Sequence, residues 1–396
     1  MLFKKDELKL LWPFYVSSLS FGLAIMIMPF MIIYFQGLNL SYFQIAVIYS
    51  AVALSAFIFE VPTGSFADII GRKNSVIIGL LLRAVSAIII PLTHNFYVLV
   101  FTSLLAGAGI AFANGAEQSW VISNLNKLKR KDLHHEYFIK YQAFGAVGAV
   151  ISPLLGAWIV KYYSISLLWY GMGLFIVLSA IMLFIFGQEL YFIKQKSFKN
   201  SVKSFYKKTV SGIRFSFTHK IIFLLILSSV FILLMDFGGM GWQPYLTSLS
   251  MPNYTLGVVY SLFAVAIIFM PFLSKLFMRY QVKNALILVT LIKMLLIFTL
   301  FFIMPPLYVF GAIIFVFYNS INYLADPLYQ TYFHKFIPEK IRATVASTQG
   351  MLIQLTATVC PLVAGLMMDV YGPGKVLALG GFFGVFAIVT YMKIKD

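Results

Sequence analysis

The sequence is poor in charge and in cysteine, and each shortage excludes a class of protein. Of its 396 residues, 11% are charged and 61% are hydrophobic, with a mean hydropathy of +0.91. A soluble domain is about 25% charged, so no water-soluble core of this length could bury so much apolar surface. The single cysteine, Cys360, excludes an internal disulfide framework and a cysteine-rich metal site, and the five histidines show no ligand spacing. The composition therefore favours an integral membrane protein without a bound metal.

Long apolar runs recur along the whole chain. A membrane-spanning helix needs about 20 predominantly apolar residues. Twelve such runs are present, at 11–36, 41–66, 74–93, 96–122, 137–160, 164–186, 220–246, 254–277, 284–303, 306–330, 343–368 and 374–392. The first run is too long for the apolar core of a cleaved signal peptide, so we expect it to remain a helix. The sequence thus predicts an all-α membrane protein with twelve transmembrane helices.

Basic residues outnumber acidic residues by 30 to 13, and their positions indicate topology. Twenty-six of the 30 lie at the termini or in every second loop, on the same side of the membrane as the termini. The loops on the other side contain only Lys161 and Lys375. Because cytoplasmic loops carry the excess of Lys and Arg, both termini are expected to be cytoplasmic. The net charge of +17 then records topology and contact with membrane lipids, and it does not indicate nucleic acid. The expected location is the plasma membrane, or the inner membrane of a Gram-negative bacterium.

A polar stretch divides the twelve runs into two groups of six. We expect an N-terminal bundle at 1–186, a basic cytoplasmic linker at 187–219 and a C-terminal bundle at 220–396. Within the linker, Phe198, Val202, Phe205, Thr209 and Ile213 recur at helical spacing among lysines. This pattern predicts an amphipathic helix on the inner leaflet. A solvated basic loop is the alternative.

The two groups of six also resemble each other in sequence. Segment 47–74 matches 258–284, and Pro153-Leu-Leu-Gly156 parallels Pro361-Leu-Val-Ala-Gly365, at offsets between 208 and 211. Secondary transporters of one large class are built from such repeats, with a substrate site near the midplane. The repeat predicts two pseudo-symmetric six-helix bundles.

The same offset relates charged residues inside the spans. Arg83 corresponds to Lys293, and Glu117 corresponds to Asp326. Because buried charges are costly unless paired, we expect a cation and a carboxylate to pair within each half. These pairs are interpreted as structural ion pairs or as a switch for protons or substrate.

Asp236 lies inside the seventh apolar run and has no charged equivalent in the repeat. With no obvious cation nearby, its carboxyl group is expected to bind a proton or a cationic substrate. The hypothesis is that Asp236 couples proton movement to transport, together with Glu117 and Asp326. The alternative is a neutral Asp236 held by a hydrogen bond from a neighbouring helix.

The loop after the second run reads Gly64-Ser-Phe-Ala-Asp68-Ile-Ile-Gly71-Arg72-Lys73. It resembles the signature loop of the major facilitator superfamily, Gly-x-Leu-Ala-Asp-Arg-x-Gly-Arg-Lys, with Ile69 in place of a basic residue. The resemblance implies a conformational latch formed by Gly64, Asp68, Gly71 and Arg72, in which Asp68 binds the start of span eleven. Contact with anionic lipid is the alternative role for Arg72 and Lys73.

Other motifs are similar to the drug- and macrolide-exporter-like branch of that superfamily. These are Glu60-Val-Pro62-Thr-Gly64, which adds Glu60 to the latch, and Ile337-Pro-Glu-Lys-Ile-Arg342-Ala-Thr-Val-Ala-Ser347. Gly148-x-x-x-Ser152-Pro153-x-x-Gly156 resembles the antiporter motif, with Ser152 in place of a glycine. Span four, however, lacks the arginine of the best-known drug antiporters, and Ser123 replaces the acid that often pairs with the signature-loop arginine.

By the same resemblance, spans one, four, seven and ten line a substrate cavity. Their methionine, aromatic and amide side chains suit amphiphilic ligands. For each residue taken separately, ordinary helix packing is the favoured explanation. The expected lining residues are Met26, Tyr34, Asn114, Gln118, Trp120, Phe237, Trp242, Asn319, Asn322 and Tyr323.

The sequence therefore predicts a monomeric secondary transporter that works by alternating access. The preferred activity is proton-coupled export of amphiphilic organic compounds. The alternatives are uptake of a small metabolite such as a sugar or organic anion, lipid transport on the same fold, and a polytopic receptor or channel. The chain contains no phosphate-binding loop and no other sign of an enzyme, so neither a nucleotide nor another cofactor is expected.

Overall fold

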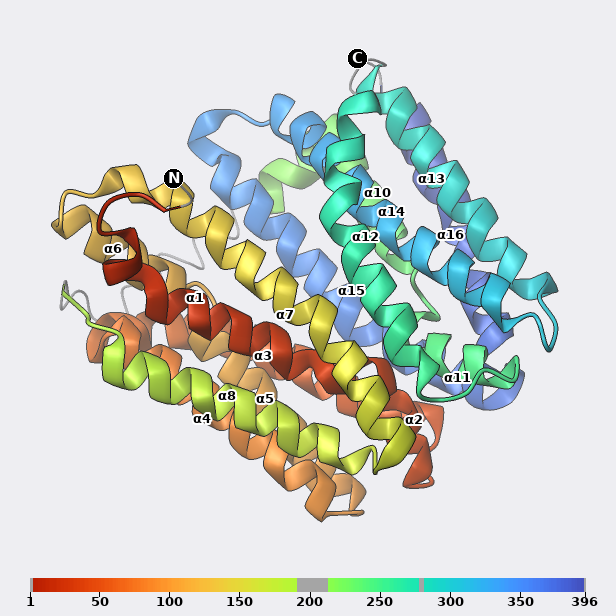
Figure 1. Ribbon diagram of the computed structural model, residues 1–396. Helices are drawn as coiled ribbons and strands as arrows, with labels where there is room; N and C mark the ends of the chain where they lie inside the picture. Colours follow the sequence, from red (N-terminus) through yellow and green to blue (C-terminus); the bar gives the residue numbers. More distant parts are fainter. Residues whose placement is uncertain (1–2, 191–212, 278–280, 395–396) are drawn as a thin grey trace. The chain divides into compact units, whose positions relative to one another are not determined.

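The computed structural model describes residues 3–190, 213–277 and 281–394, which are helical apart from short connections (Figure 1). Its helices are α1 (Glu7–Ala24), α2 (Met31–Gly37), α3 (Tyr42–Ile70), α4 (Arg72–Ile89), α5 (Phe96–Ala113), α6 (Ala116–Lys127), α7 (His134–Tyr162), α8 (Ser166–Phe186), α10 (Lys220–Leu234), α11 (Trp242–Ser248), α12 (Thr255–Phe277), α13 (Val282–Thr299), α14 (Tyr308–Lys335), α15 (Arg342–Tyr371) and α16 (Pro373–Met392). Within the described residues, 12 helical segments are long and apolar enough to cross a membrane, which confirms the predicted number of spans.

The helices form two compact units. Among the described residues, unit 1 contains 3–31 and 51–190, whereas unit 2 contains 32–50, 213–277 and 281–394. Helix α3 therefore belongs to both units, because its first turns group with the C-terminal helices. The bundle boundaries expected from the sequence stay a prediction. Of the expected linker, only 187–190 and 213–219 are described, so the amphipathic pattern around Phe198, Val202 and Phe205 lies outside the described residues.

Unit 1 is held together by close helix pairs. In Figure 1, α1 (red) lies between α7 (yellow) and α8 (yellow-green). A Cβ atom added to Gly22 of α1 would lie 2.3 Å from the Gly145 carbonyl oxygen of α7, so only glycine permits this approach. Ser152 Oγ also donates to the Gly22 carbonyl at 2.9 Å. Small residues of this kind let membrane helices associate through backbone contact.

Three of the spans expected to line the cavity are interrupted. Span one contains the 3₁₀ segment η1 (Ile25–Phe30). Span four breaks between α5 and α6, where Asn114 is extended and Gly115 has a φ of 71°. Span seven breaks between α10 and α11, around the 3₁₀ segment η4 (Gly239–Gly241). Span ten, in contrast, is the single helix α14. Helix breaks at membrane depth expose backbone groups where a cavity is lined, and they often mark transport sites.

Candidate transport site

Among the described residues of unit 2, the most strongly buried charge belongs to Lys293 on α13. Its ammonium group donates to Asp236 Oδ2 and to Asn322 Oδ1, both at 2.9 Å. Asn322 Nδ2 also lies 3.3 Å from Asp236 Oδ2, so the three side chains form a closed triad. The Lys293 side chain is 2% exposed, whereas that of Asp236 is 25% exposed. The triad therefore has a buried cationic side and a partly accessible carboxylate.

The break in span seven explains why Asp236 takes part in this triad. Helix α10 ends at Leu234, and Asp236 lies in the turns that follow it. A Cβ atom on Gly238 would lie 2.5 Å from the Leu377 backbone nitrogen, so this break packs directly against α16. Residues with a side chain could not make that approach. The non-helical turn directs Asp236 toward α13 and α14.

This pairing corrects the sequence-based interpretation of unit 2. Asp236 was expected to lack a cationic partner, and Lys293 was expected to pair with Asp326; instead Lys293 pairs with Asp236. Asp326 is an exposed residue of α14 and interacts with Gln330 at 3.4 Å. The sequence repeat aligns Asp326 with Glu117, but it carries no information on how the break in span seven turns the chain. Asp326 as a proton-coupling residue stays a prediction.

The corresponding charges of unit 1 are arranged differently. The Arg83 guanidinium lies over the Phe21 ring, with Cζ 4.5 Å from the ring centroid. Glu117 is in the first turn of α6, where it interacts with the Tyr141 hydroxyl, and its Oε1 is buried without a hydrogen-bond partner. Among the residues that the structure describes, no ion pair joins Arg83 to Glu117, so the predicted pair is wrong. A cation–π contact stabilises the arginine instead.

The signature loop ends in a tight turn at Gly71, whose φ is 97°. Helix α4 begins at Arg72, and the Arg72 guanidinium reaches α6, where Nη1 donates to the Ser119 carbonyl at 2.6 Å and to Ser123 Oγ. The hydroxyl that replaces the family's acid at position 123 is therefore still a partner of the arginine. Glu60 and the backbone of Asp68 are in α3, but the Asp68 side chain lies outside what the structure describes.

A residue that the sequence did not single out supplies a carboxylate to this loop. Glu189 accepts the backbone N–H groups of Arg72 at 2.8 Å and Lys73 at 3.3 Å, which caps the start of α4. Glu189 follows the sixth span without any recognisable motif, so only its acidity next to a basic loop could have drawn attention to it.

Residues 188–190 are bound to α6 through their backbone. Trp120 Nε1 and Asn124 Nδ2 donate to the Gln188 carbonyl at 3.0 and 2.6 Å, and Asn124 Oδ1 accepts the Leu190 N–H at 2.9 Å. We call residues 188–190 the strap. The strap ties the end of α8 to α6 and, through Glu189, to the start of α4.

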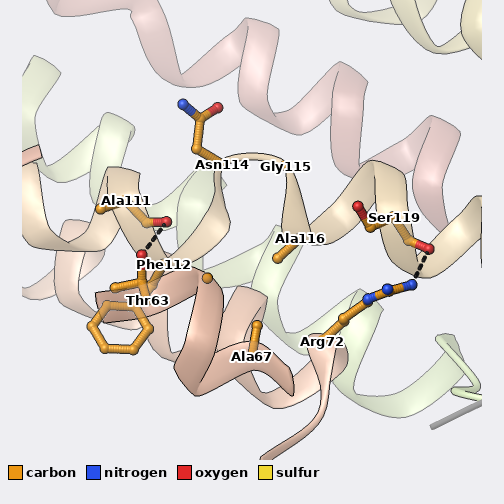
Figure 2. A pocket seen from close by; sticks show the side chains of 10 residues that line it. Thr63, Ala67, Arg72, Ala111, Phe112, Asn114, Gly115, Ala116 and Ser119 are labelled. Atoms are coloured by element: carbon orange, nitrogen blue, oxygen red, sulfur yellow. Dashed lines mark hydrogen bonds between the residues drawn. The ribbon is translucent and has the colours of Figure 1, made fainter. Parts of the chain in front are cut away.

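A cavity of about 250 Å³ lies beside the break in span four (Figure 2). Figure 2 shows Arg72 extending along α6 toward Ser119, and Thr63 donating to the Ala111 carbonyl at 3.0 Å. Gly64 and Asn114 also line this cavity, and a Cβ atom on Gly64 would meet no atom within 4 Å. Gly64 thus borders open space.

The residues of spans one and four that were expected to line the substrate cavity differ in how deeply they are buried. Trp120 is 0% exposed because it packs in the unit 1 core with Phe14 and Tyr137, and its indole N–H is bonded to the strap. Its predicted place in a cavity lining is therefore wrong for this structure. Met26 and Tyr34 are 3% and 7% exposed. Gln118 and Asn114 are exposed beside the break in span four.

In unit 2, two of the predicted lining residues, Trp242 and Tyr323, belong to one group of aromatic side chains, and their place in a cavity lining stays a prediction. The Trp242 ring stacks on Phe315 with centroids 4.3 Å apart, and Tyr260 and Tyr323 extend the aromatic cluster through further ring contacts. Asn319 on α14 donates to the Phe315 carbonyl at 3.0 Å. The Tyr318 ring meets the Phe315 ring edge to face, with centroids 5.7 Å apart. Phe237 lies nearby in sequence and contacts Phe383 at 5.9 Å. We refer to Trp242, Tyr260, Phe263, Phe315, Tyr318 and Tyr323 as the aromatic cluster.

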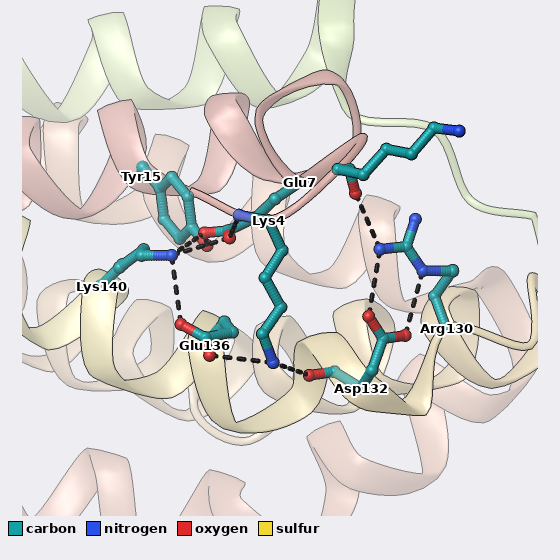
Figure 3. A network of polar contacts seen from close by, with 8 residues as sticks. Lys4, Glu7, Tyr15, Arg130, Asp132, Glu136 and Lys140 are labelled. Atoms are coloured by element: carbon teal, nitrogen blue, oxygen red, sulfur yellow. Dashed lines mark hydrogen bonds and ion pairs between the residues drawn. The ribbon is translucent and has the colours of Figure 1, made fainter. Parts of the chain in front are cut away.

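A second ionic network anchors the N-terminal segment to α7 (Figure 3). The Glu7 side chain is fully buried and accepts two hydrogen bonds from Lys140 Nζ, at 2.6 and 2.7 Å, and one from the Tyr15 hydroxyl at 2.9 Å. Glu136 bridges Lys140 and Lys4 at 3.2 and 3.0 Å. Every charge in this set has a partner, which indicates a structural role. No cluster of potential metal ligands occurs in the described ranges.

The repeated apolar spans, the broken helices and the buried charges define a multi-pass membrane transporter. A sequence profile of the Major Facilitator Superfamily matches residues 14–361, and the chain belongs to this superfamily. The uncharacterized MFS-type transporter YxaM of Bacillus subtilis (strain 168) is 21% identical over 97% of this chain and 96% of its own length.

Two further matches are proteins named for an activity. The multidrug resistance protein MdtH of Escherichia coli O1:K1 / APEC is 30% identical over 25% of this chain and 24% of its own length. The crystal structure of nucleoside transporter NupG matches with a TM-score of 0.76 at 15% identity, covering 99% of this chain and 100% of that chain. At this identity the structural match establishes the fold alone.

Proposed function

We propose that the protein is a proton-coupled exporter of amphiphilic organic compounds that works by alternating access. The observation that carries this proposal is the pairing of a partly exposed Asp236 with an almost fully buried Lys293. A proton that binds Asp236 removes the negative partner of Lys293. The lysine then keeps only Asn322, and an uncompensated buried charge is strongly destabilising. Protonation therefore favours a conformation in which Lys293 finds another partner or water.

Glu117 is proposed as a second proton-binding group, because its Oε1 is buried without a partner. Its place at the break in span four puts the carboxylate at the start of α6, where free backbone N–H groups stabilise negative charge. Gly64, Asp68, Gly71 and Arg72 are proposed to form the conformational latch that the signature loop implies.

The chemistry of the cargo is inferred from the aromatic cluster. Trp242 and Phe315 are buried at its centre, whereas Tyr260 and Phe263 are half-buried and Tyr323 is exposed, so these outer rings offer the apolar faces. Asn319 and Asn322 supply polar groups on the helix of Tyr323, α14. Such a lining favours molecules with an extended apolar body and few polar groups. The partial similarity to MdtH agrees with this inference. Uptake of a polar metabolite is the competing activity, since the fold is shared with a nucleoside transporter.

The test is transport by the purified protein in proteoliposomes under an imposed pH gradient. Ligands are first found by thermal-shift screening of amphiphilic cations, neutral drugs, nucleosides and sugars. We expect an amphiphilic compound to stabilise the protein and to accumulate against its gradient. Asp236→Asn should reduce gradient-driven accumulation by about tenfold, which is the factor that corresponds to a typical coupling free energy between two sites. Asp132→Asn is the matched control, because Asp132 is an exposed carboxylate that pairs with Arg130 and not with Lys293.

Two outcomes would contradict the proposal. If Asp236→Asn accumulates cargo as the unaltered protein does, Asp236 does not couple proton movement. If nucleosides or sugars alone stabilise the protein and enter the vesicles with protons, the activity is uptake of a polar metabolite.

A further inference from the structure

The start of α3 is held by a residue at the far end of another helix. Asp369, near the end of α15, accepts the backbone N–H of Tyr42 at 2.7 Å through Oδ1 and that of Phe43 at 3.0 Å through Oδ2. All of these residues belong to unit 2. Both carboxylate oxygens are thus used to bind the first two amides of a helix more than 300 residues away in sequence.

The remaining amides at the start of α3 are satisfied locally. Ser41 Oγ accepts the Gln44 N–H at 3.2 Å, and Gln44 Oε1 accepts the Ser41 N–H at 2.9 Å, which is a capping box. The first hydrogen bond within the helix runs from Ile45 N to the Ser41 carbonyl. Because the capping box leaves only the amides of Tyr42 and Phe43 without partners, Asp369 completes the cap.

Two further contacts continue along the same faces of α3 and α15. A Cβ atom on Gly365 would lie 2.7 Å from the Tyr42 carbonyl oxygen and 2.8 Å from Ala46 Cβ. In the turn of α3 that follows Ala46, Ser50 Oγ donates to the carbonyl of Thr358, which precedes Gly365 on α15, at 2.7 Å. Residues 42, 46 and 50 recur at helical spacing, as do 358, 365 and 369. The contact is a direct backbone approach with hydrogen bonds at both ends.

This contact constrains the movement of the protein because α3 belongs to both units. Its first turns, through Ser50, group with α15, whereas the rest of the helix from Ala51 groups with unit 1. If unit 2 moves relative to unit 1, α3 must either bend or leave α15. Leaving is chemically reversible: the Asp369 carboxylate and two amides exchange their hydrogen bonds for bonds to water, so the net loss is modest.

We propose that Asp369 forms a reversible latch between α3 and α15, separate from the signature-loop latch. It holds the start of α3 on α15 in the conformation described here and releases it in the alternative conformation. Tyr42 follows the first span, and Asp369 ends the eleventh, so the latch lies at the membrane face opposite the chain's N-terminus. Gly365 provides the close approach, and Ser50 provides the second attachment. Release would expose Ala46, which is 0% exposed when the latch is closed.

The test uses Ala46→Cys as a reporter in a Cys360→Ser background, which removes the single native thiol. A membrane-impermeant maleimide labels the reporter in sealed vesicles or cells. We expect Asp369→Ala to raise the labelling rate about fivefold, the effect of losing one helix cap. Asp369→Asn keeps an oxygen acceptor but loses the charge, and it should give a smaller rise.

The matched control is Gln44→Ala, which breaks the local capping box and leaves Asp369 in place. It should leave the labelling rate within about twofold, because α3 remains attached to α15. Equal rises for Gln44→Ala and Asp369→Ala would mean that α3 merely frays, and an unchanged rate in both Asp369 variants would mean that no latch exists; either result overturns the proposal. If Asp369→Ala does not fold, the Asp369→Asn rate is decisive. The assay needs no cargo and no pH gradient, so its outcome is independent of the proposed activity.

Discussion

Glu189 Oε1 accepts the backbone N–H of Arg72 at 2.8 Å, so a residue just after the sixth span fixes the first residue of α4. A Cβ atom on the preceding Gly71 would lie 2.7 Å from Glu189 Oε2, which shows how closely the carboxylate covers the turn. The strap thereby joins the signature loop to the segment that leads into the second half of the chain.

This relationship predicts that Glu189→Ala lowers both stability and transport. The loss of a helix cap costs about 1 kcal/mol, and a mobile start of α4 should also slow conformational change. Adding Ser123→Asp should partly restore transport, because an acid at position 123 gives Arg72 a stronger partner on α6. Thermal unfolding in detergent and transport rate are the measurements.

Gln188→Ala is the control for the strap. Gln188 binds Trp120 and Asn124 through its backbone carbonyl, which the substitution keeps. It should behave like the unaltered protein. A Glu189→Ala variant with normal stability and normal transport would remove the strap from the mechanism.

The Asp236–Lys293 pair predicts non-additive effects on stability. Lys293→Met leaves the Asp236 carboxylate without its cation, and Asp236→Asn leaves a buried ammonium group; each change should cost about 3 kcal/mol or more. The double variant removes both charges and should be more stable than Lys293→Met. A double-mutant cycle on thermal or denaturant unfolding checks this, and strictly additive losses would argue against a direct interaction.

Glu117 predicts a separable effect on coupling. Glu117→Gln keeps a polar group beside Tyr141 but cannot release a proton, so gradient-driven transport should fall about tenfold while cargo exchange without a gradient persists. Tyr141→Phe is the matched control, because it removes the hydroxyl and keeps the acid. Equal losses of exchange and of gradient-driven transport in Glu117→Gln would instead indicate a structural role.

The Glu7 network predicts a change in stability without a change in coupling. Lys140→Met removes two hydrogen bonds from a fully buried carboxylate, so the apparent Tm should fall by several degrees. Arg130→Gln removes partly exposed ion pairs with Asp132 and Asp6 and a hydrogen bond to the Lys5 carbonyl, so it should lower the Tm by less than Lys140→Met does. The pH dependence of transport by Lys140→Met protein that remains folded should match that of the unaltered chain. A shifted pH dependence would give this network a part in transport.

The sequence predicted the fold well because membrane spans depend on local composition. Twelve apolar runs and the signature loop were sufficient, since a helix in lipid must satisfy its own backbone. The site was less predictable. Which carboxylate meets Lys293 depends on how the chain turns after Leu234, and that turn depends on Gly238 packing against α16.

The roles of Glu189 and Asp369 could not be predicted from the sequence for a related reason. Both bind backbone amides at the start of another helix, so their partners have no characteristic side chain. A sequence shows an acid and a helix start, but only the fold brings the two together.

The different surroundings of Glu117 and Asp326 bear on how the two halves of the chain diverged. The residues hold matching places in the sequence repeat, yet Glu117 is at a helix break with a buried oxygen, whereas Asp326 is exposed on an unbroken α14. If the halves descend from one ancestral segment, a single backbone interruption has changed what an inherited acid can do. Divergence after duplication then needed no new titratable residue, only a glycine and an asparagine that end one helix early.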